Sequence, residues 1–162
     1  MIILSANAAN AIKLENFPFM SDVHLGIVSG LGWGLNIGAG GWLNYKDIKF
    51  GAEIEQMMTD YDYTATINWT RYGGILGYNF GNFVLNYHIG ALSFTPSRTI
   101  NYTNMAGQAQ SVTENINYKG SYWAVSADFK TGEFTLSPKY IVMTFLNKGS
   151  FAETDLNLGK SF

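Results

Sequence analysis

The sequence predicts an all-β protein, an eight-stranded antiparallel up-and-down transmembrane β-barrel. Three observations lead to this prediction. Apolar and polar residues alternate with a period of two, tight turns alternate with longer polar connections, and charged residues are scarce. The 162 residues are 14% charged, 47% hydrophobic and 15% aromatic, whereas soluble domains are about 25% charged. The chain therefore lacks roughly half of the charge that normally solvates a domain surface.

Composition also excludes several classes of function. The net charge of −2 leaves no basic stripe to neutralise phosphates, so no nucleic-acid partner is expected. Because cysteine is absent, disulfide scaffolds and cysteine-bound metal or iron–sulfur sites are excluded. A chain of this length is expected to form one domain.

The N-terminus resembles the end of a secretory signal peptide. An apolar start is followed by small residues with A-x-A spacing at positions 6–8 and 9–11. We expect residues 1–11 to be a residual signal-peptide-like segment, residues 12–20 a lead-in, and residues 21–162 a single β-barrel domain. The alternative is a frayed N-terminus rich in small residues.

Four segments alternate most clearly, at residues 33–45, 47–58, 83–93 and 152–162. In the second, Ile48, Phe50 and Ile54 share one face, while Lys49 and Glu53 share the other, as in a β-strand. Residues 23–45 and 72–97 lack Asp, Glu, Lys and Arg and are long enough for membrane helices. Their period of two, and a turn signal at residues 79–82 in the second stretch, favour strands instead.

Four weaker segments, residues 22–31, 64–80, 115–129 and 133–145, bring the number of candidate strands to eight. Ile67 and Trp69 are out of phase with the apolar residues that follow them. This predicts a bulge near Thr70 and Arg71, or a strand end already clear of the membrane. Pro138 weakens the prediction of the seventh strand because proline cannot donate a ladder hydrogen bond.

The connections between these segments alternate in length. Residues 45–47, 80–82 and 130–132 predict tight hairpins, whereas residues 59–63, 95–114 and 147–151 are longer and polar. The segment 95–114 is rich in Ser, Thr, Asn and Gln, and the flanking strands still need partners. We therefore expect it to be a surface loop rather than a linker.

The apolar face is expected to point outward, toward lipid. The opposite face is mostly Gly, Asn and Ser with scattered charges, which suits the crowded lumen of a small barrel. Aromatic residues beside the tight hairpins predict an interfacial girdle; they are Tyr45, Phe50, Phe80, Phe83, Phe129 and Phe134. Candidates for a second girdle beside the longer loops are Trp33, Met58, Trp69, Phe94 and Trp123.

These alternating segments and connections, with a last strand that ends in Phe162, resemble the small eight-stranded outer-membrane barrels of Gram-negative bacteria. Examples are the OmpA transmembrane domain, OmpX and OmpW-like proteins. The resemblance covers nearly all of the chain from about Asp22 and implies a monomer in the outer membrane, in contact with the lipid bilayer and lipopolysaccharide. It also implies that Phe162 is the signal for the barrel-assembly machinery. Lys160 departs from the family, which usually has an apolar residue there, and is expected to weaken recognition or to snorkel to the interface.

Parity along the strands predicts which ionisable side chains face the lumen. They are Asp22, His24, Lys49, Glu53, Glu55, Arg71, His88, Asp128, Glu133, Lys139, Glu153 and Asp155. Because such charges must pair in a water-poor interior, we expect Glu53 or Glu55, Arg71, Asp128 and Lys139 to form an ion-pair network, with His88 nearby. This network would plug the lumen; the alternative is a narrow pore for small solutes or ions.

An enzyme is the less favoured class. Outer-membrane barrels that resemble lipid A deacylases or palmitoyl transferases use His and Ser, and here the histidines are His24 and His88. Asp22 or Asp128 would orient them, and the candidate nucleophiles are Ser29, Ser93 and Ser126. No nucleophile-elbow or zinc-site spacing supports this, so we expect no enzyme, no metal and no cofactor. Residues 60–62, Asp-Tyr-Asp, are at best a weak calcium contact.

Two further interpretations concern partners. The loops, chiefly residues 95–114 with Arg98, Tyr102 and Met105, are the expected contact surface for an extracellular ligand, and an open strand edge there would bind by strand addition, as in OmpX. A soluble lipocalin-like carrier of an apolar ligand is the other architecture. Residues 40–42 match that family's G-x-W spacing, but they lie in the second strand rather than near the first.

Overall fold

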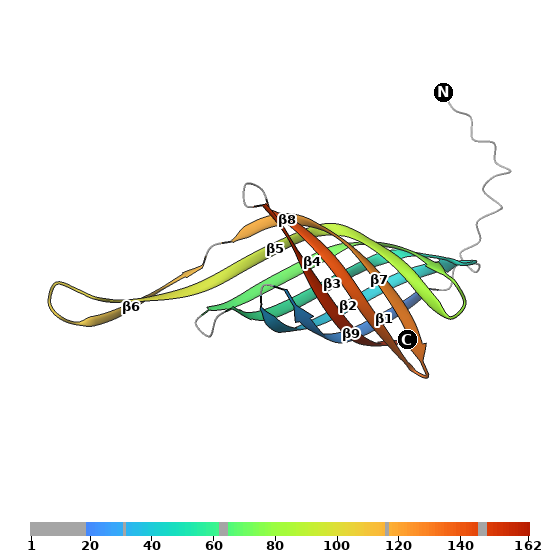
Figure 1. The fold of residues 1–162 in the computed structure, drawn as a ribbon, viewed down its shortest axis with the longest axis horizontal. Coiled ribbons are helices and arrows are strands. Elements are labelled where there is room, and N and C mark those ends of the chain that lie inside the picture. The colour runs from blue at the N-terminus through green and yellow to red at the C-terminus, as the bar shows by residue number, and fades with distance from the viewer. Residues whose placement is uncertain (1–18, 31, 62–64, 116, 146–148) are drawn as a thin grey trace, which may run out of the picture.

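In the computed structural model the chain forms an antiparallel β-barrel with a long hairpin projecting from one end (Figure 1). The structure describes residues 19–30, 32–61, 65–115, 117–145 and 149–162. Within them the strands are β1 (Phe19–Ser29), β2 (Trp33–Tyr45), β3 (Ile48–Tyr61), β4 (Ala65–Asn79), β5 (Phe83–Thr103), β6 (Ala109–Asn115), β7 (Tyr118–Thr131), β8 (Phe134–Phe145) and β9 (Gly149–Ser161). No helix among the described residues is long and apolar enough to cross a membrane.

The strands follow an up-and-down order that closes on itself. Each barrel strand pairs with the next, β5 pairs with both β4 and β7, and β1 pairs with β9. Within the described residues β6 pairs with β5 alone and forms the second arm of the projecting hairpin. Eight strands therefore build the closed wall, which confirms the predicted fold class.

The tight turns gather at one end of the barrel, which we call the turn end. Lys46, Gly81 and Gly132 adopt positive φ angles of 54°, 88° and 65° there, as short hairpin turns require. The C-terminus lies at the same end (Figure 1), where Phe162 N–H donates to the Ser21 carbonyl at 2.8 Å and the Phe162 carbonyl accepts a bond from Ser21 N–H at 3.3 Å. The opposite end carries the β5–β6 hairpin, and we call it the hairpin end.

The alternation of the sequence is inverted relative to that of a soluble barrel. On β3, Ile54 is 55% exposed whereas the neighbouring Glu55 is completely buried. The same holds around the wall, because large apolar side chains point outward on every barrel strand and most ionisable ones point inward; Lys119 and Lys160 are exceptions. An apolar outer wall around a polar interior is the pattern of a barrel in lipid.

The predicted bulge in the fourth strand is wrong. The β3–β4 pairing runs without interruption from Ile48↔Tyr78 to Tyr61↔Ala65. Ile67 and Trp69 keep the inward phase of Arg71, and both are buried. In the sequence these two residues interrupt the pattern of outward-facing apolar residues, because they point into a part of the lumen that is itself apolar.

The expected surface loop 95–114 is mostly a β-hairpin. Its arms pair from Ser97↔Asn115 to Thr103↔Ala109 and extend the β5 ladder well beyond the barrel wall (Figure 1). Pro138 does lie within a strand, β8, and pairs with Leu156. On the side that faces β7, the described register pairs stop at Ser126↔Lys139 and resume at Phe129↔Leu136. A gap in the ladder is expected here because proline has no N–H to donate.

Candidate functional site: the barrel lumen

The centre of the lumen holds an ion-pair network around Arg71. Its guanidinium Nε lies 3.0 Å from Glu55 Oε2 and its Nη1 lies 3.3 Å from Glu153 Oε1, and Nη2 pairs with Asp155 Oδ2. Glu55 is on the neighbouring strand β3, but Glu153 and Asp155 come from β9. Arg71 therefore ties the middle of the wall to the closing strand, and its side chain is fully buried.

Lys139 extends this network from β8. Its Nζ lies 3.1 Å from Glu53 Oε2 and 2.8 Å from Glu55 Oε1. His24 Nε2 contacts the same Glu55 Oε1 at 3.0 Å, and its Nδ1 lies 3.6 Å from Asp22. With Arg71, these contacts form a buried network that spans the lumen and is bonded at most of its charged atoms.

Asp128, expected in the network, and Glu133, expected in the lumen, are placed differently by the structure. Asp128 pairs with Lys49 at 3.1 Å and accepts a bond from Ser137 Oγ at 2.8 Å, instead of joining Arg71 or Lys139. Asp128 is the register partner of Val84, close to the turn end, so it lies between the turn end and the central network. Glu133 lies in the β7–β8 turn, where it is exposed and pairs with Lys160 at 2.9 Å, so neither residue of this pair is in the lumen.

Between this network and the hairpin end, the lumen is filled by apolar side chains. Trp69 is completely buried and stacks on Phe94 with ring centroids 4.4 Å apart. Phe145 and Phe151 contact the same indole at 5.9 and 5.7 Å. The rest of this apolar cluster comprises Val28, Met57, Ile67, Leu92, Tyr118, Tyr122, Ala124, Ile141 and Met143. Trp69 and Phe94 are thus interior, and their assignment to a second aromatic girdle is wrong.

The girdle candidates at the turn end lie on or near the outer surface. Phe80 stacks on Phe83 at 5.1 Å, and Phe83 lies 5.8 Å from Phe129. Tyr45, Phe50, Phe80, Phe129 and Phe134 are exposed, and Phe83 is half-buried. Trp33, Met58 and Trp123 are exposed on the outer wall, nearer the hairpin end.

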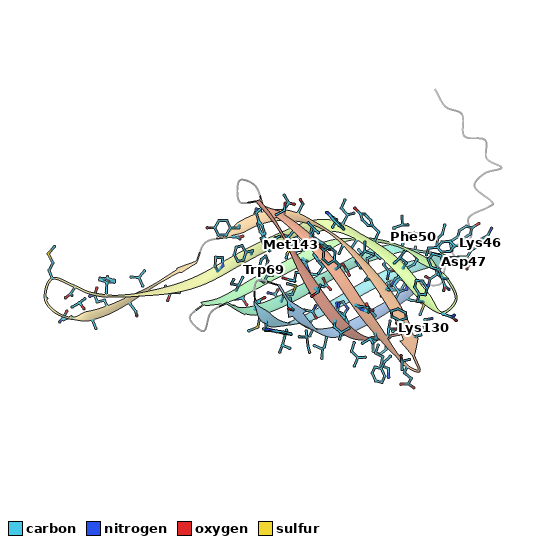
Figure 2. All side chains as sticks on the ribbon, viewed as in Figure 1. Lys46, Asp47, Phe50, Trp69, Lys130 and Met143 are labelled. Carbon is cyan, nitrogen blue, oxygen red and sulfur yellow. The ribbon has the colours of Figure 1, made fainter. Side chains whose placement is uncertain are left out.

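A cavity of about 270 Å³ opens at the turn end below the network. Lys46, Asp47 and Lys130 lie at its mouth, while Trp69 and Met143 lie toward the hairpin end (Figure 2). Lys49 Nζ lies inside, 3.9 Å above the Trp42 ring, in a cation–π contact. The lumen is therefore open at the turn end, through this cavity, and closed at the hairpin end. We call the cavity the vestibule.

His88 lines the inner part of this vestibule together with Glu53 and Ser126. His88 Nδ1 lies 2.7 Å from Glu53 Oε1, and His88 Nε2 lies 2.9 Å from Ser126 Oγ. Asn86 Nδ2 also donates to Ser126 Oγ, at 3.2 Å. Glu53, His88 and Ser126 come from β3, β5 and β7, so the closure of the barrel brings them together.

The remaining candidates do not gather. Ser29 and Ser93 are half-buried and lie on other parts of the wall from His88. No group of three or more His, Cys, Asp or Glu within the described residues is arranged to hold a metal ion. The side chains of residues 60–62 and of Arg98 lie outside the described part of the structure.

Sequence reasoning missed the apolar cluster and the central role of β9. Parity places Glu153 and Asp155 in the lumen but does not assign them to the network. The register of the β8–β9 hairpin could have identified them. Lys139 is the direct partner of Asp155, and Ile141 is the partner of Glu153, so this hairpin alone places both carboxylates near Lys139.

Comparison with solved structures places this architecture among outer-membrane β-barrels. A major outer membrane protein of Thermus thermophilus is 12% identical with a TM-score of 0.62, over 90% of this chain and 100% of that one. The outer membrane protein Ail of Yersinia pestis, in a phospholipid bilayer nanodisc, is 12% identical with a TM-score of 0.57, over 90% and 100%. The N-terminal β-barrel domain of OprF from Pseudomonas aeruginosa is 13% identical with a TM-score of 0.53, over 88% and 97%.

At these identities the likeness shows the fold alone. The chain has the fold of the small eight-stranded outer-membrane barrels, which confirms the resemblance seen in its sequence. No protein-family model matches the chain, and neither does any curated protein sequence.

Proposed function

We propose that this protein is an integral outer-membrane barrel of a Gram-negative bacterium, with a closed lumen and a surface-interaction role. The observation that carries this proposal is the inverted wall: every barrel strand points apolar side chains outward, and a buried network of charged side chains fills the centre. A soluble carrier of the lipocalin kind would need the opposite arrangement, because its outer wall faces water. The fold that this chain shares with known outer-membrane proteins supports the same location.

The lumen is closed by two barriers in series. Arg71 and its carboxylates span the middle, and the apolar cluster around Trp69 fills the hairpin end. A water-filled path would have to break both barriers. We therefore expect no stable single-channel steps when the purified, folded protein is added to a planar lipid bilayer; stable steps would establish the narrow pore instead.

The β5–β6 hairpin is the proposed contact surface. Its tip is held by Asn104, whose side-chain Oδ1 accepts bonds from Ala106 N–H at 3.0 Å and Gln108 N–H at 2.9 Å. The arms are linked by Tyr102 Oη donating to Gln110 Oε1 at 2.8 Å. Exposed apolar side chains on a preordered ribbon, notably Met105, suit contact with a protein partner, and the ribbon's edge suits strand addition.

Orientation is the first test, because turns of such barrels face the periplasm and longer loops face the outside. The chain contains no cysteine, so Met105→Cys and Lys46→Cys each introduce one thiol, at the hairpin tip and in a tight turn. A membrane-impermeant maleimide should label Met105→Cys on intact cells. Lys46→Cys should react only after the outer membrane is permeabilised, and the reverse pattern would refute the proposed role of the hairpin.

The remaining partners follow from this location. We propose that the apolar wall contacts phospholipid and lipopolysaccharide, that the protein is a monomer, and that the last strand is read by the barrel-assembly machinery through Phe162. Migration in SDS gels tests whether such a barrel forms, since a detergent-folded barrel runs differently before and after boiling. An unchanged band would contradict the membrane barrel.

A further inference from the structure

Glu53, His88 and Ser126 have the connectivity of a serine hydrolase triad. With Nδ1 protonated, His88 donates to Glu53 Oε1 at 2.7 Å, and its free Nε2 accepts a bond from the Ser126 hydroxyl at 2.9 Å. Each side chain comes from a different barrel strand. Such triads are recognised by this geometry rather than by sequence order or fold.

The orienting carboxylate is itself firmly held. Lys139 Nζ donates to both oxygens of Glu53, at 3.3 and 3.1 Å, and Tyr122 Oη donates to Glu53 Oε1 at 3.3 Å. A carboxylate fixed in this way keeps the imidazole in one tautomer and one orientation. His88 therefore presents its basic Nε2 to Ser126.

The other lumen histidine provides a contrast. His24 contacts Glu55 through Nε2 and lies near Asp22 through Nδ1, so carboxylates face both of its ring nitrogens. It has the surroundings of a histidine that only pairs with charges. His88, with a carboxylate on one nitrogen and a hydroxyl on the other, has the surroundings of a general base.

The three triad residues are buried, and all three border one cavity. Glu53, His88 and Ser126 all line the 270 Å³ vestibule, which opens at the turn end. Asn86 lines it as well and directs its Nδ2 to the serine hydroxyl at 3.2 Å. That amide is placed to donate to an oxyanion formed beside Ser126 Oγ.

We propose that the vestibule is a hydrolytic site for small carboxylic esters that enter from the turn end, with Ser126 as nucleophile and His88 as general base. Ser126 Oγ bonds to the ester carbonyl carbon while its proton passes to His88 Nε2. The C–O bond to the alcohol then breaks, and the alcohol leaves with that proton. Water attacks the acyl-serine, His88 takes its proton and returns it to Ser126 Oγ, and the carboxylic acid is released.

The shape of the vestibule limits the substrate. Its volume of about 270 Å³ is slightly below the usual range for ligand pockets, roughly 300–1,000 Å³, so it suits short acyl chains rather than a lipid A acyl group. The closed hairpin end leaves no second exit, and substrate and products share the opening at the turn end. This activity goes beyond the surface role proposed above and departs from the expectation that the chain is not an enzyme.

Covalent labelling of the full chain folded in detergent micelles tests the site directly. A small fluorophosphonate should add one phosphonyl group, located on Ser126 by peptide mass spectrometry. Protein boiled in SDS should remain unlabelled. Absence of this adduct on folded wild-type protein, checked by its gel migration, would overturn the proposal without bearing on the barrel itself.

Hydrolysis of p-nitrophenyl acetate provides the kinetic test. Ser126→Ala and His88→Gln should each lower kcat/KM at least 100-fold. Glu53→Gln should lower kcat while leaving KM nearly unchanged, because it alters the orientation and charge behind the base rather than the ester contacts. Ser121→Ala, on the outer face of the same strand, is the matched control and should retain wild-type turnover. If folded Ser126→Ala turned over as fast as the control, Ser126 would not be the nucleophile.

Discussion

Arg71 and Glu55 are direct register partners across the β3–β4 ladder, and their charged atoms lie 3.0 Å apart with neither side chain exposed. Arg71 also reaches Glu153 and Asp155 on β9. A single side chain thus links strands that are more than 80 residues apart in sequence. Removal of Arg71 would leave three buried carboxylates without the cation that they share.

The first prediction concerns that residue. Arg71→Met should lower the free energy of unfolding by about 3–5 kcal/mol, because Glu55, Glu153 and Asp155 lose their shared cation in a buried site. Urea titration of the barrel in lipid vesicles, followed by tryptophan fluorescence, measures the change.

Lys160→Met is the matched control. It also removes a cation from an ion pair, but Lys160 and Glu133 are both exposed, so a change below about 1 kcal/mol is expected. Equal effects of the two substitutions would show that the Arg71 pairs contribute no more than a surface contact.

The second prediction concerns the apolar cluster. Trp69→Ala should cost about 3–5 kcal/mol, because it leaves a cavity among Phe94, Phe145 and Phe151. Trp33→Ala should cost clearly less, since this residue is 72% exposed and lipid can fill the space it vacates. The same unfolding measurement compares them, and a larger loss for Trp33→Ala would contradict the interior placement of Trp69.

The sequence sufficed to predict the fold because a barrel wall repeats one local rule. Alternation with a period of two assigns inside and outside, and the turn signals divide the strands. The rule fails for Trp69 because it assumes that every lumen-facing residue is polar. In the structure, apolar side chains fill the part of the lumen toward the hairpin end.

The candidate site was predictable only in part. Parity placed Glu53 and His88 on the inner wall, and Ser126 was one of three candidate nucleophiles. The distances between these residues depend on the pairing of β3, β4, β5 and β7. Ser126 and His88 are separated by 38 positions and meet only because β5 and β7 are neighbours in the closed sheet. Such contacts need the register of the whole wall, which no local pattern provides.

The third prediction uses two glycines of the wall. A Cβ at Gly38 would collide with the His24 imidazole and the Glu55 side chain, both of which are bonded in place. Gly38→Ala should therefore cost about 1–3 kcal/mol through overpacking. Gly74→Ala is the control, because the nearest atom to its added Cβ is a carbonyl oxygen 3.8 Å away. Tolerance of both substitutions would mean that the lumen relaxes more readily than its bonded network indicates.

The fourth prediction separates assembly in cells from the stability of the folded barrel. Phe162 is 70% exposed, and what ties it to the wall is backbone bonding with Ser21. Phe162→Ser preserves those bonds, so refolding into detergent should be nearly unchanged, while the amount of heat-modifiable barrel in the outer membrane should fall several-fold. Phe19→Ser removes an equally exposed aromatic residue from the same end, at 69% exposure, and should assemble normally. If both variants assembled equally well in cells, Phe162 would be one more lipid-facing ring rather than an assembly signal.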